Sequence, residues 1–343
     1  MSKAVRFRAT GVLAAAVMLA MTLLVVAGSK PADAAFPGRN GKIAFSKENF
    51  RQGSSGIFTI NPDGSGSTRI GSGYSPSWSA DGEKVVFEDV TGDGEEEFNQ
   101  DIYVMNADGS GVDQITSSRA YDFSPSFFPS GDKIAFIRDS PRNGTDIFTI
   151  NLDGTGLTKL TDDPGFYEES LAVSPDGTKI AYSRYNRSSE IFVMDADGSN
   201  VENLTRTGRV DEFGPDWSPD GQKIAFTSYR FDFVRSGDAE EGRAFVPQAI
   251  ESEAAASEEP REDVEISVMN ADGTDRKDLT NSSAFDASPA FSPNGNRIAF
   301  SRLTFSERSE EGDIFVMRAD GSGVKQLTDT RAFEWGSDWQ PIP

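Results

Sequence analysis

Short apolar runs, rich in aromatic and β-branched residues, recur along the chain and are separated by Pro, Gly, Asp and Ser. Residues 121–161 contain one complete set, with SPSF from Ser124, KIAF from Lys133, IFTI from Ile147 and TKLT from Thr158. Aromatic and β-branched residues favour strands, whereas the residues between the runs favour turns. The pattern therefore predicts a unit of four short antiparallel strands.

The second and third runs of this unit each occur six times. The second run starts at Lys42, Lys84, Lys133, Lys179, Lys223 and Arg297, and the third at Ile57, Ile102, Ile147, Ile191, Ile266 and Ile314. Successive second runs lie 42, 49, 46, 44 and 74 residues apart, so one unit contains an insertion. A four-stranded repeat of roughly 40 to 45 residues is typical of a β-propeller blade, which buries its faces by stacking on neighbouring blades. We therefore expect an all-β fold, a six-bladed β-propeller of four-stranded antiparallel blades.

The two ends of the chain predict how this ring closes. The last run, GSDW from Gly336, is similar to a first run but no second run follows it, and the first blade begins directly with its second run at Lys42. A C-terminal strand without a blade and an N-terminal blade without a first strand complete each other and leave no open sheet edge. We expect the strand of Trp339 to pair with the strand that begins near Ile43.

The two faces of such a ring differ in this sequence. Because the strands are antiparallel, the turns between strands one and two and between strands three and four lie on one face, which we call the constant face. The opposite, variable face carries the loops between strands two and three, where the gaps from the last aromatic residue of the second run to the first Ile of the third are 11, 14, 10, 8, 39 and 13 residues. Variation on one face of a repeated scaffold is typical of a recognition surface.

The longest of these loops contains an acidic insertion in blade five, residues 230–263. It is rich in Glu and poor in apolar residues, which favours a solvated, disordered loop. A second interpretation is an arm that folds over the channel mouth or onto a partner through its few apolar residues. These are Phe231, Phe233, Phe245 and Val246.

The first 34 residues do not follow the repeat. Basic residues precede an apolar run from Val12 to Ala27, and Ala32-Asp33-Ala34 is a small-residue cleavage pattern. Together they predict a signal peptide at residues 1–34, ahead of a propeller at residues 35–343. A retained membrane anchor is the alternative, for which the apolar run is short. We expect an exported protein of the periplasm, cell envelope or medium, with no stable membrane span after cleavage.

The charge of the chain limits its partners. The net charge is −22, and residues 1–34 carry a net +3, so the remaining chain has a net charge of −25. Nucleic acids and anionic membranes are themselves negative and are disfavoured as partners. The chain has no Cys, so no disulfide supports the fold. We expect a monomer that binds a protein partner in the envelope or medium and does not bind nucleic acid.

Acidic residues recur two positions before the first run of a blade. They are Asp122, Glu168, Glu212, Asp286 and Glu334, and Gly73 takes the sixth place. Because first strands line the axis of a propeller, we expect these carboxylates to form an axial ring on the variable face. They either accept backbone N–H bonds in their own loops or bind a ligand, partner or cation, of which calcium suits several carboxylate oxygens; the metal itself stays open.

Aromatic residues flank the same positions and predict an aromatic rim around the channel mouth. The rim consists of Tyr74, Tyr121, Tyr167, Phe213 and Trp335. Aromatic side chains at blade junctions either pack between blades or anchor a partner.

Charged residues also flank the hairpin of strands two and three. A basic residue follows the second run and an acidic residue precedes the third, so the two lie opposite each other. We expect cross-strand ion pairs of Arg138 with Asp146, Arg184 with Glu190 and Arg302 with Asp313.

Catalytic motifs are scarce. The chain has no His and no Cys, which excludes Ser-His-Asp and Cys-His arrangements and His-bearing zinc sites. We expect a binding scaffold that acts through its variable acidic face, with no enzymatic activity, no catalytic residues and no cofactor apart from calcium at the axial ring. The alternative is a cation-dependent ligand binder or a carbohydrate-active enzyme that uses the axial carboxylates.

The sequence SPDGQKIAF, from Ser218 to Phe226, followed by ISVMNADGT and DLT, resembles the WD40-like PD40 repeats of the TolB propeller family. The resemblance covers the chain from about residue 40 to its end. It implies a six-bladed propeller exported to the envelope, where TolB proteins bind protein partners of the Tol-Pal system. TolB proteins carry an α/β domain ahead of the propeller, whereas here the signal is followed directly by the first blade, so the resemblance does not extend to that domain or its contacts.

Overall fold

The computed structural model describes residues 35–49, 54–91, 99–140, 144–208, 210–231, 262–305 and 310–343. The predicted signal peptide, residues 1–34, lies outside the described residues, as do residues 232–261 of the predicted insertion. The described ranges contain strands and no helix of the length and hydrophobicity that a membrane crossing requires.

The strands follow the repeated runs of the sequence. They are β1 (Arg39–Asn49), β2 (Ser54–Ile60), β3 (Thr68–Gly71), β4 (Tyr74–Trp78), β5 (Lys84–Thr91), β6 (Asn99–Asn106), β7 (Asp113–Gln114), β8 (Tyr121–Phe127), β9 (Lys133–Ser140), β10 (Gly144–Asn151), β11 (Thr158–Lys159), β12 (Tyr167–Val173), β13 (Lys179–Tyr185), β14 (Ser189–Asp195), β15 (Glu202–Asn203), β16 (Val210–Trp217), β17 (Lys223–Phe231), β18 (Glu262–Asn270), β19 (Lys277–Asp278), β20 (Phe285–Phe291), β21 (Arg297–Phe305), β22 (Glu310–Arg318), β23 (Lys325–Gln326) and β24 (Phe333–Ile342).

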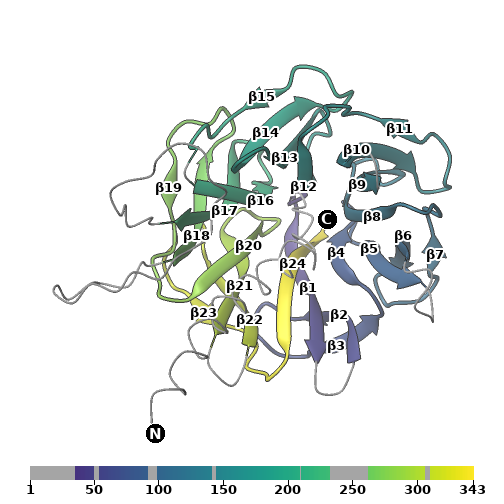
Figure 1. The fold of residues 1–343 in the computed structure, drawn as a ribbon. Coiled ribbons are helices and arrows are strands. Elements are labelled where there is room, and N and C mark those ends of the chain that lie inside the picture. Colours follow the sequence, from purple (N-terminus) through teal and green to yellow (C-terminus); the bar gives the residue numbers. More distant parts are fainter. Residues whose placement is uncertain are drawn as a thin grey trace, which may run out of the picture.

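These strands form four-stranded antiparallel groups. Strands β4–β7, β8–β11, β12–β15 and β16–β19 each form a separate sheet. The other eight strands form one sheet, in which β20–β23 and the group β24-β1-β2-β3 are joined by a single parallel bridge between Gly312 and Phe333. We call the groups unit one (β24 and β1–β3) and units two to six (β4–β7, β8–β11, β12–β15, β16–β19 and β20–β23). Figure 1 shows them set around a common centre, so the predicted all-β architecture of propeller-like sheets is confirmed.

The C-terminal strand β24 pairs antiparallel with β1, as the two ends of the sequence predict. Trp339 lies opposite Ile43 in this pairing, and Asp338 lies opposite Ala44. The Trp339 side chain is 1% exposed and packs with Ile43, Phe45 and residues of unit six. Strand β24 therefore supplies the inner strand that the N-terminal repeat lacks.

The hydrophobic core lies between units rather than within them. Each of six buried clusters joins two units that follow each other, one of them unit six and unit one, and two clusters also include Ala35 or Phe36 from the segment ahead of β1. The aromatic residue of each KIAF-type run, at most 1% exposed, is the centre of this packing. In five units it stacks on an aromatic residue of the third strand with ring centroids 5.7–6.0 Å apart. The pairs are Phe45–Phe58, Phe87–Tyr103, Phe136–Phe148, Tyr182–Phe192 and Phe300–Phe315.

Hydrogen bonds connect the inner strand of one unit to the first or second strand of the preceding unit. A bulge interrupts each inner strand, and in every unit except unit four its backbone turns to positive φ, at Ser75, Ser124, Gly214, Ser288 and Gly336. The N–H groups of these residues donate to side chains of the preceding unit. The acceptors are Ser46 Oγ for Ser75 (2.9 Å), Glu88 Oε2 for Ser124 (3.2 Å), Ser170 Oγ for Gly214 (2.9 Å), Thr227 Oγ1 for Ser288 (2.9 Å) and Ser301 Oγ for Gly336 (3.2 Å). The bulge thus frees a backbone donor that joins one unit to the next.

We expect Trp339→Ala to lower the free energy of unfolding by about 3 to 5 kcal/mol, because it leaves a cavity between units six and one. Guanidinium denaturation followed by circular dichroism measures the change. Val324→Ala, at a residue that is 42% exposed on unit six, is the control and should change stability by less than about 0.5 kcal/mol. Equal effects of the two substitutions would contradict the packing role of β24.

Candidate functional site

The five predicted axial acids lie near the starts of the inner strands, on the variable face, and all are buried. Asp122, Glu212, Asp286 and Glu334 are 0% exposed and Glu168 is 2% exposed. Four of them lie directly opposite a basic residue on the second strand of the same unit, and Glu212 lies opposite Ser228. A buried carboxylate needs a compensating partner, and each of the five has a cation within the same unit.

The pairs in units three and six have the same two-pronged geometry. Arg138 Nε and Nη2 donate to Asp122 Oδ1 and Oδ2 at 2.6 and 2.7 Å, and Arg302 contacts Asp286 at the same two distances. Each guanidinium also lies over the stacked aromatic pair of its unit, 4.8–5.6 Å from the ring centroids. The hydrogen bonds that these guanidinium groups donate to the carboxylates raise the pKa of Arg138 and Arg302. These bidentate, partly desolvated pairs are the strong kind of ion pair.

The ion pairs predicted between strands two and three are wrong. Arg138, Arg184 and Arg302 are in register with Asp146, Glu190 and Asp313, but their guanidinium groups turn to the inner strand instead. The third-strand acids have other partners: Asp146 pairs with Lys159 at 2.8 Å, Glu190 accepts from Asn203 and Asp313 accepts from Gln326. The physical reason is burial, because the inner carboxylates lose more hydration and gain more from a cation.

In units one and four the axial acid also pairs with a basic residue of the second strand, but without the two-pronged geometry. In unit one, Lys47 Nζ lies 2.7 Å from Glu334 Oε1, which also accepts from Thr330 Oγ1 at 2.8 Å. In unit four, Arg184 Nε is 3.5 Å from Glu168 Oε1, while another nitrogen of this guanidinium pairs with Asp163. Burial raises the pKa of Glu168 to about 7, and Arg184 opposes the rise.

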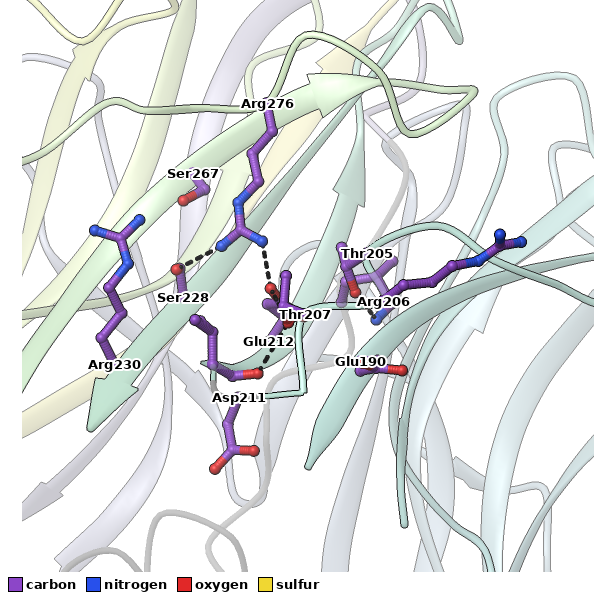
Figure 2. Close-up of polar contacts among 12 residues, drawn as sticks. Glu190, Thr205, Arg206, Thr207, Asp211, Glu212, Ser228, Arg230, Ser267 and Arg276 are labelled. Atoms are coloured by element: carbon purple, nitrogen blue, oxygen red, sulfur yellow. Dashed lines mark hydrogen bonds and ion pairs between the residues drawn. The ribbon is translucent and has the colours of Figure 1, made fainter. Parts of the chain in front are cut away.

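In unit five the axial acid, Glu212, also pairs with a cation, but this cation comes from a different part of the unit. Ser228 stands where other units carry the basic residue, and Arg276, just before β19, extends across the sheet to pair with Glu212 and to donate to Ser228 Oγ at 2.9 Å (Figure 2). The third strand has Ser267 where other units have an aromatic residue, and the Arg276 guanidinium lies 5.1 Å from the Phe226 centroid. The small Ser267 side chain therefore leaves room for the arginine.

Glu212 has further partners on its other side. Thr207 Oγ1 contacts both of its carboxylate oxygens, at 2.9 and 3.1 Å. Burial raises the pKa of Glu212, and bonds from Thr205 and Arg276 oppose this rise. The carboxylate is thus held between a cation and hydroxyl groups.

Unit two departs from the pattern. Gly73 has φ +89°, and a Cβ there would lie 2.5 Å from the Glu88 carbonyl oxygen, so no carboxylate fits in the sixth place. Asp89 stands in the position of the basic residue and accepts from Ser72 Oγ at 2.5 Å. The neighbouring Glu88 is 3% exposed, accepts from Ser75 Oγ at 2.6 Å and from Ser124 N, and its pKa is raised by burial.

A second acidic group, missed by the sequence analysis, lies where units four and five meet. Ser189 Oγ donates to Glu169, and Ser189 N donates to Asp211 Oδ1 at 2.8 Å. Burial, with a smaller contribution from Asp211, raises the pKa of Glu169 to about 7. The signal in the sequence is the residue type, since unit four has an acid where the other units have aromatic residues or alanine: Tyr74, Phe123, Phe213, Ala287 and Trp335.

The predicted rim aromatics divide into exposed and packed residues. Tyr121 and Tyr167 are 37% and 50% exposed. Tyr74 stacks on the buried Trp335 with centroids 5.8 Å apart, and Phe213 packs against residues of units five and six. Tyr185, 42% exposed, was not predicted and lies opposite Tyr167 across β12 and β13.

The axial acids do not converge on a shared centre in the described part of the chain. Across its ranges, no group of three or more acidic residues is placed to hold a metal ion. Their carboxylates contact cations and hydroxyl groups of their own units, an arrangement that stabilises each unit at its inner end. Calcium binding by these residues stays a prediction.

We expect Arg276→Met to lower the free energy of unfolding by about 3 kcal/mol, because Glu212 then stays buried without its cation. Adding Glu212→Gln should recover most of the loss, and so should adding Ser228→Arg, which restores the arrangement of units three and six. Denaturant unfolding of the four proteins tests this, with exposed Lys277→Met as the control. A double variant no more stable than Arg276→Met would refute the pairing.

We expect Glu169→Gln to make stability less dependent on pH. The pKa of Glu169 is raised from 4.5 to about 7 in the folded state, so its stabilising contribution is present below pH 4.5 and is lost as pH rises through 7. The substitution should therefore raise stability at pH 8 by on the order of 1–2 kcal/mol and change little at pH 4. Urea unfolding between pH 4 and 8 measures this, and exposed Glu202→Gln, which should leave the profile unchanged, is the control.

Comparisons with known proteins agree with the propeller fold. Residues 48–228 match the family model described as the TolB beta propeller domain, PD40. A protein TolB homolog from Chlorobium luteolum is 42% identical over 62 residues, which are 18% of this chain and 13% of that protein, so the matched part is a small share of the relative's length.

Two solved structures show the same fold. TolB from Acinetobacter baumannii is 20% identical with a TM-score of 0.67, over 94% of this chain and 70% of that chain. The putative TolB from Agrobacterium tumefaciens is 19% identical with a TM-score of 0.56, over 88% of this chain and 99% of that chain. The resemblance seen in the repeats is confirmed, and because the family model covers more than half of the sequence, the chain belongs to the PD40 family of TolB beta propeller domains.

Proposed function

We propose that the six units are the blades of one closed propeller. The six buried clusters support this, because each joins two consecutive units and the series returns from unit six to unit one. The pairing of β24 with β1 supports closure by the two chain ends. Each unit is then one blade of the propeller.

We propose that this propeller is an exported, non-enzymatic scaffold that binds a protein partner through its variable face. The observation that carries the proposal is the position of the exposed tyrosines. Tyr121 and Tyr167 begin inner strands and Tyr185 ends a second strand, so all three lie on the variable face of blades three and four. Exposed aromatic residues that are grouped on one face favour protein recognition.

The exposed aliphatic residues have a different location. Val112, Leu157, Val201 and Val324 are 42–53% exposed and follow the turns between strands three and four, at the outer edge of the constant face. They lie in four different blades, at the same position of the repeat in each, and do not form a group. The two faces therefore differ in chemistry as well as in loop length.

The charge of the chain supports a partner with basic residues. Without residues 1–34 the net charge is −25, and the acidic surface attracts cationic segments over a range of about 10 Å at 0.1 M salt. The TolB resemblance implies an envelope location, where such a partner would be another exported protein. The axial carboxylates do not favour an enzymatic alternative, because ion pairs within the blades occupy them.

We expect the triple variant Tyr121→Ser, Tyr167→Ser, Tyr185→Ser to lose capture of its partner by at least roughly ten-fold, as expected when aromatic anchors are removed. The measurement is a quantitative pull-down from envelope extract, followed by titration of the captured protein at several salt concentrations. The matched control is Val112→Ser, Leu157→Ser, Val201→Ser, which changes exposed residues of the constant face. Equal capture by both variants would contradict the assignment of the binding face.

A further inference from the structure

The first described residues of the chain are buried between blades that are not adjacent. Ala35 is 2% exposed and belongs to the cluster of blades five and six. Phe36, the next residue, is 4% exposed and belongs to the cluster of blades two and three. In a six-bladed ring these two junctions lie on opposite sides of the axis. Ala35 and Phe36 are consecutive residues, so their Cα atoms are only about 3.8 Å apart. The segment must therefore lie at the centre of the ring, where the purple start of the ribbon is seen in Figure 1.

The contacts of this segment place it at the constant face. Ala35 N donates to the carbonyl oxygen of Trp217, the last residue of an inner strand, at 3.3 Å. Gly38 N donates to the carbonyl oxygen of Pro293 in the turn between strands one and two of blade six, at 3.1 Å. Both the ends of the inner strands and the turns between strands one and two lie on the constant face. The hydrogen bonds therefore fix the segment across the mouth of the axis on that side.

The sequence of the segment suits this position. The Phe36 ring fills space between blades two and three, where its cluster includes Val86 and Phe127. At Gly38 a Cβ would lie 2.9 Å from the Ile342 carbonyl oxygen, so only glycine passes so close to the end of β24. Asn40 Oδ1 accepts from Asn294 N at 3.1 Å and ties the following strand to blade six.

We propose that residues 35–38 are a plug that closes the axis of the propeller at its constant face. A partner then reaches the axis from the variable face alone. This inference rests on the proposed six-bladed ring and names the side from which the proposed binding occurs.

The tryptophans provide a direct probe of the plug. Trp78, Trp217 and Trp339 lie at or near the constant-face ends of inner strands and are at most 2% exposed. They are three of the four tryptophans of the chain, and the fourth, Trp335, lies toward the variable face. Quenching of tryptophan fluorescence by acrylamide, in a Trp335→Phe background, therefore reports solute access at the constant face.

The experiment compares Phe36→Ala and Phe36→Leu with the parent protein. With a plug, the Stern–Volmer constant should rise by roughly two-fold or more in Phe36→Ala and less in Phe36→Leu, because close packing is what excludes solutes from an interior. Val201→Ala, at an exposed site of the constant face, is the control and should leave quenching unchanged. Circular dichroism and a cooperative unfolding transition show that each variant keeps its sheets.

Unchanged quenching in a folded Phe36→Ala protein would overturn the proposal. If Phe36→Ala does not fold, the same criterion applies to Phe36→Leu, which keeps an apolar side chain. No partner is present in this measurement, so its failure is distinct from a failure of the Tyr121, Tyr167 and Tyr185 substitutions to reduce partner capture.

Discussion

Every blade of this propeller has two apolar faces, and that constraint determines most of the structure. A four-stranded sheet with Phe or Tyr on one side and Ile or Val on the other cannot be buried alone, so it packs between two neighbours. The clusters show this directly, since their residues come from pairs of blades and none of the six is confined to a single blade. A chain of such sheets leaves two unburied end faces unless the last sheet meets the first, and in the proposed ring β24 brings these faces together through its pairing with β1.

Because the axial acids are buried at the starts of the inner strands, their negative charges must be compensated by nearby cations. The five axial acids are almost fully excluded from water, and the chain compensates each one locally with a lysine or arginine. Blade five is instructive because Ser228, Ser267 and Arg276 differ together from the other repeats. The cation has moved to another strand, and the aromatic ring that would block its path is absent. The requirement is therefore for a positive charge at a point in space, and the chain meets it from more than one sequence position.

Much of this fold can be predicted from the sequence, because each repeat shows its strands as short apolar runs and its turns as Gly, Pro, Asp and Ser between them. The pairing of Trp339 with Ile43 follows from counting runs at the two ends. The partners of Arg138 do not follow, because the arginine is in register with an acid on each side and only relative burial decides between Asp122 and Asp146. The path of the Arg276 side chain to Glu212 depends on the absence of an aromatic ring on the neighbouring strand β18, where Ser267 stands. Residues 35–38 have no periodicity, so nothing in their sequence indicates where they pack.

The outer edges of the blades are unusually short. Strands β7, β11, β15, β19 and β23 have two residues each, whereas β3 has four. An edge of two residues offers few free N–H and C=O groups to a strand from another molecule, which protects a sheet-rich protein from aggregation. Blade one has the longest outer edge, so lateral association of two molecules, under conditions that loosen the fold, would begin at Thr68–Gly71.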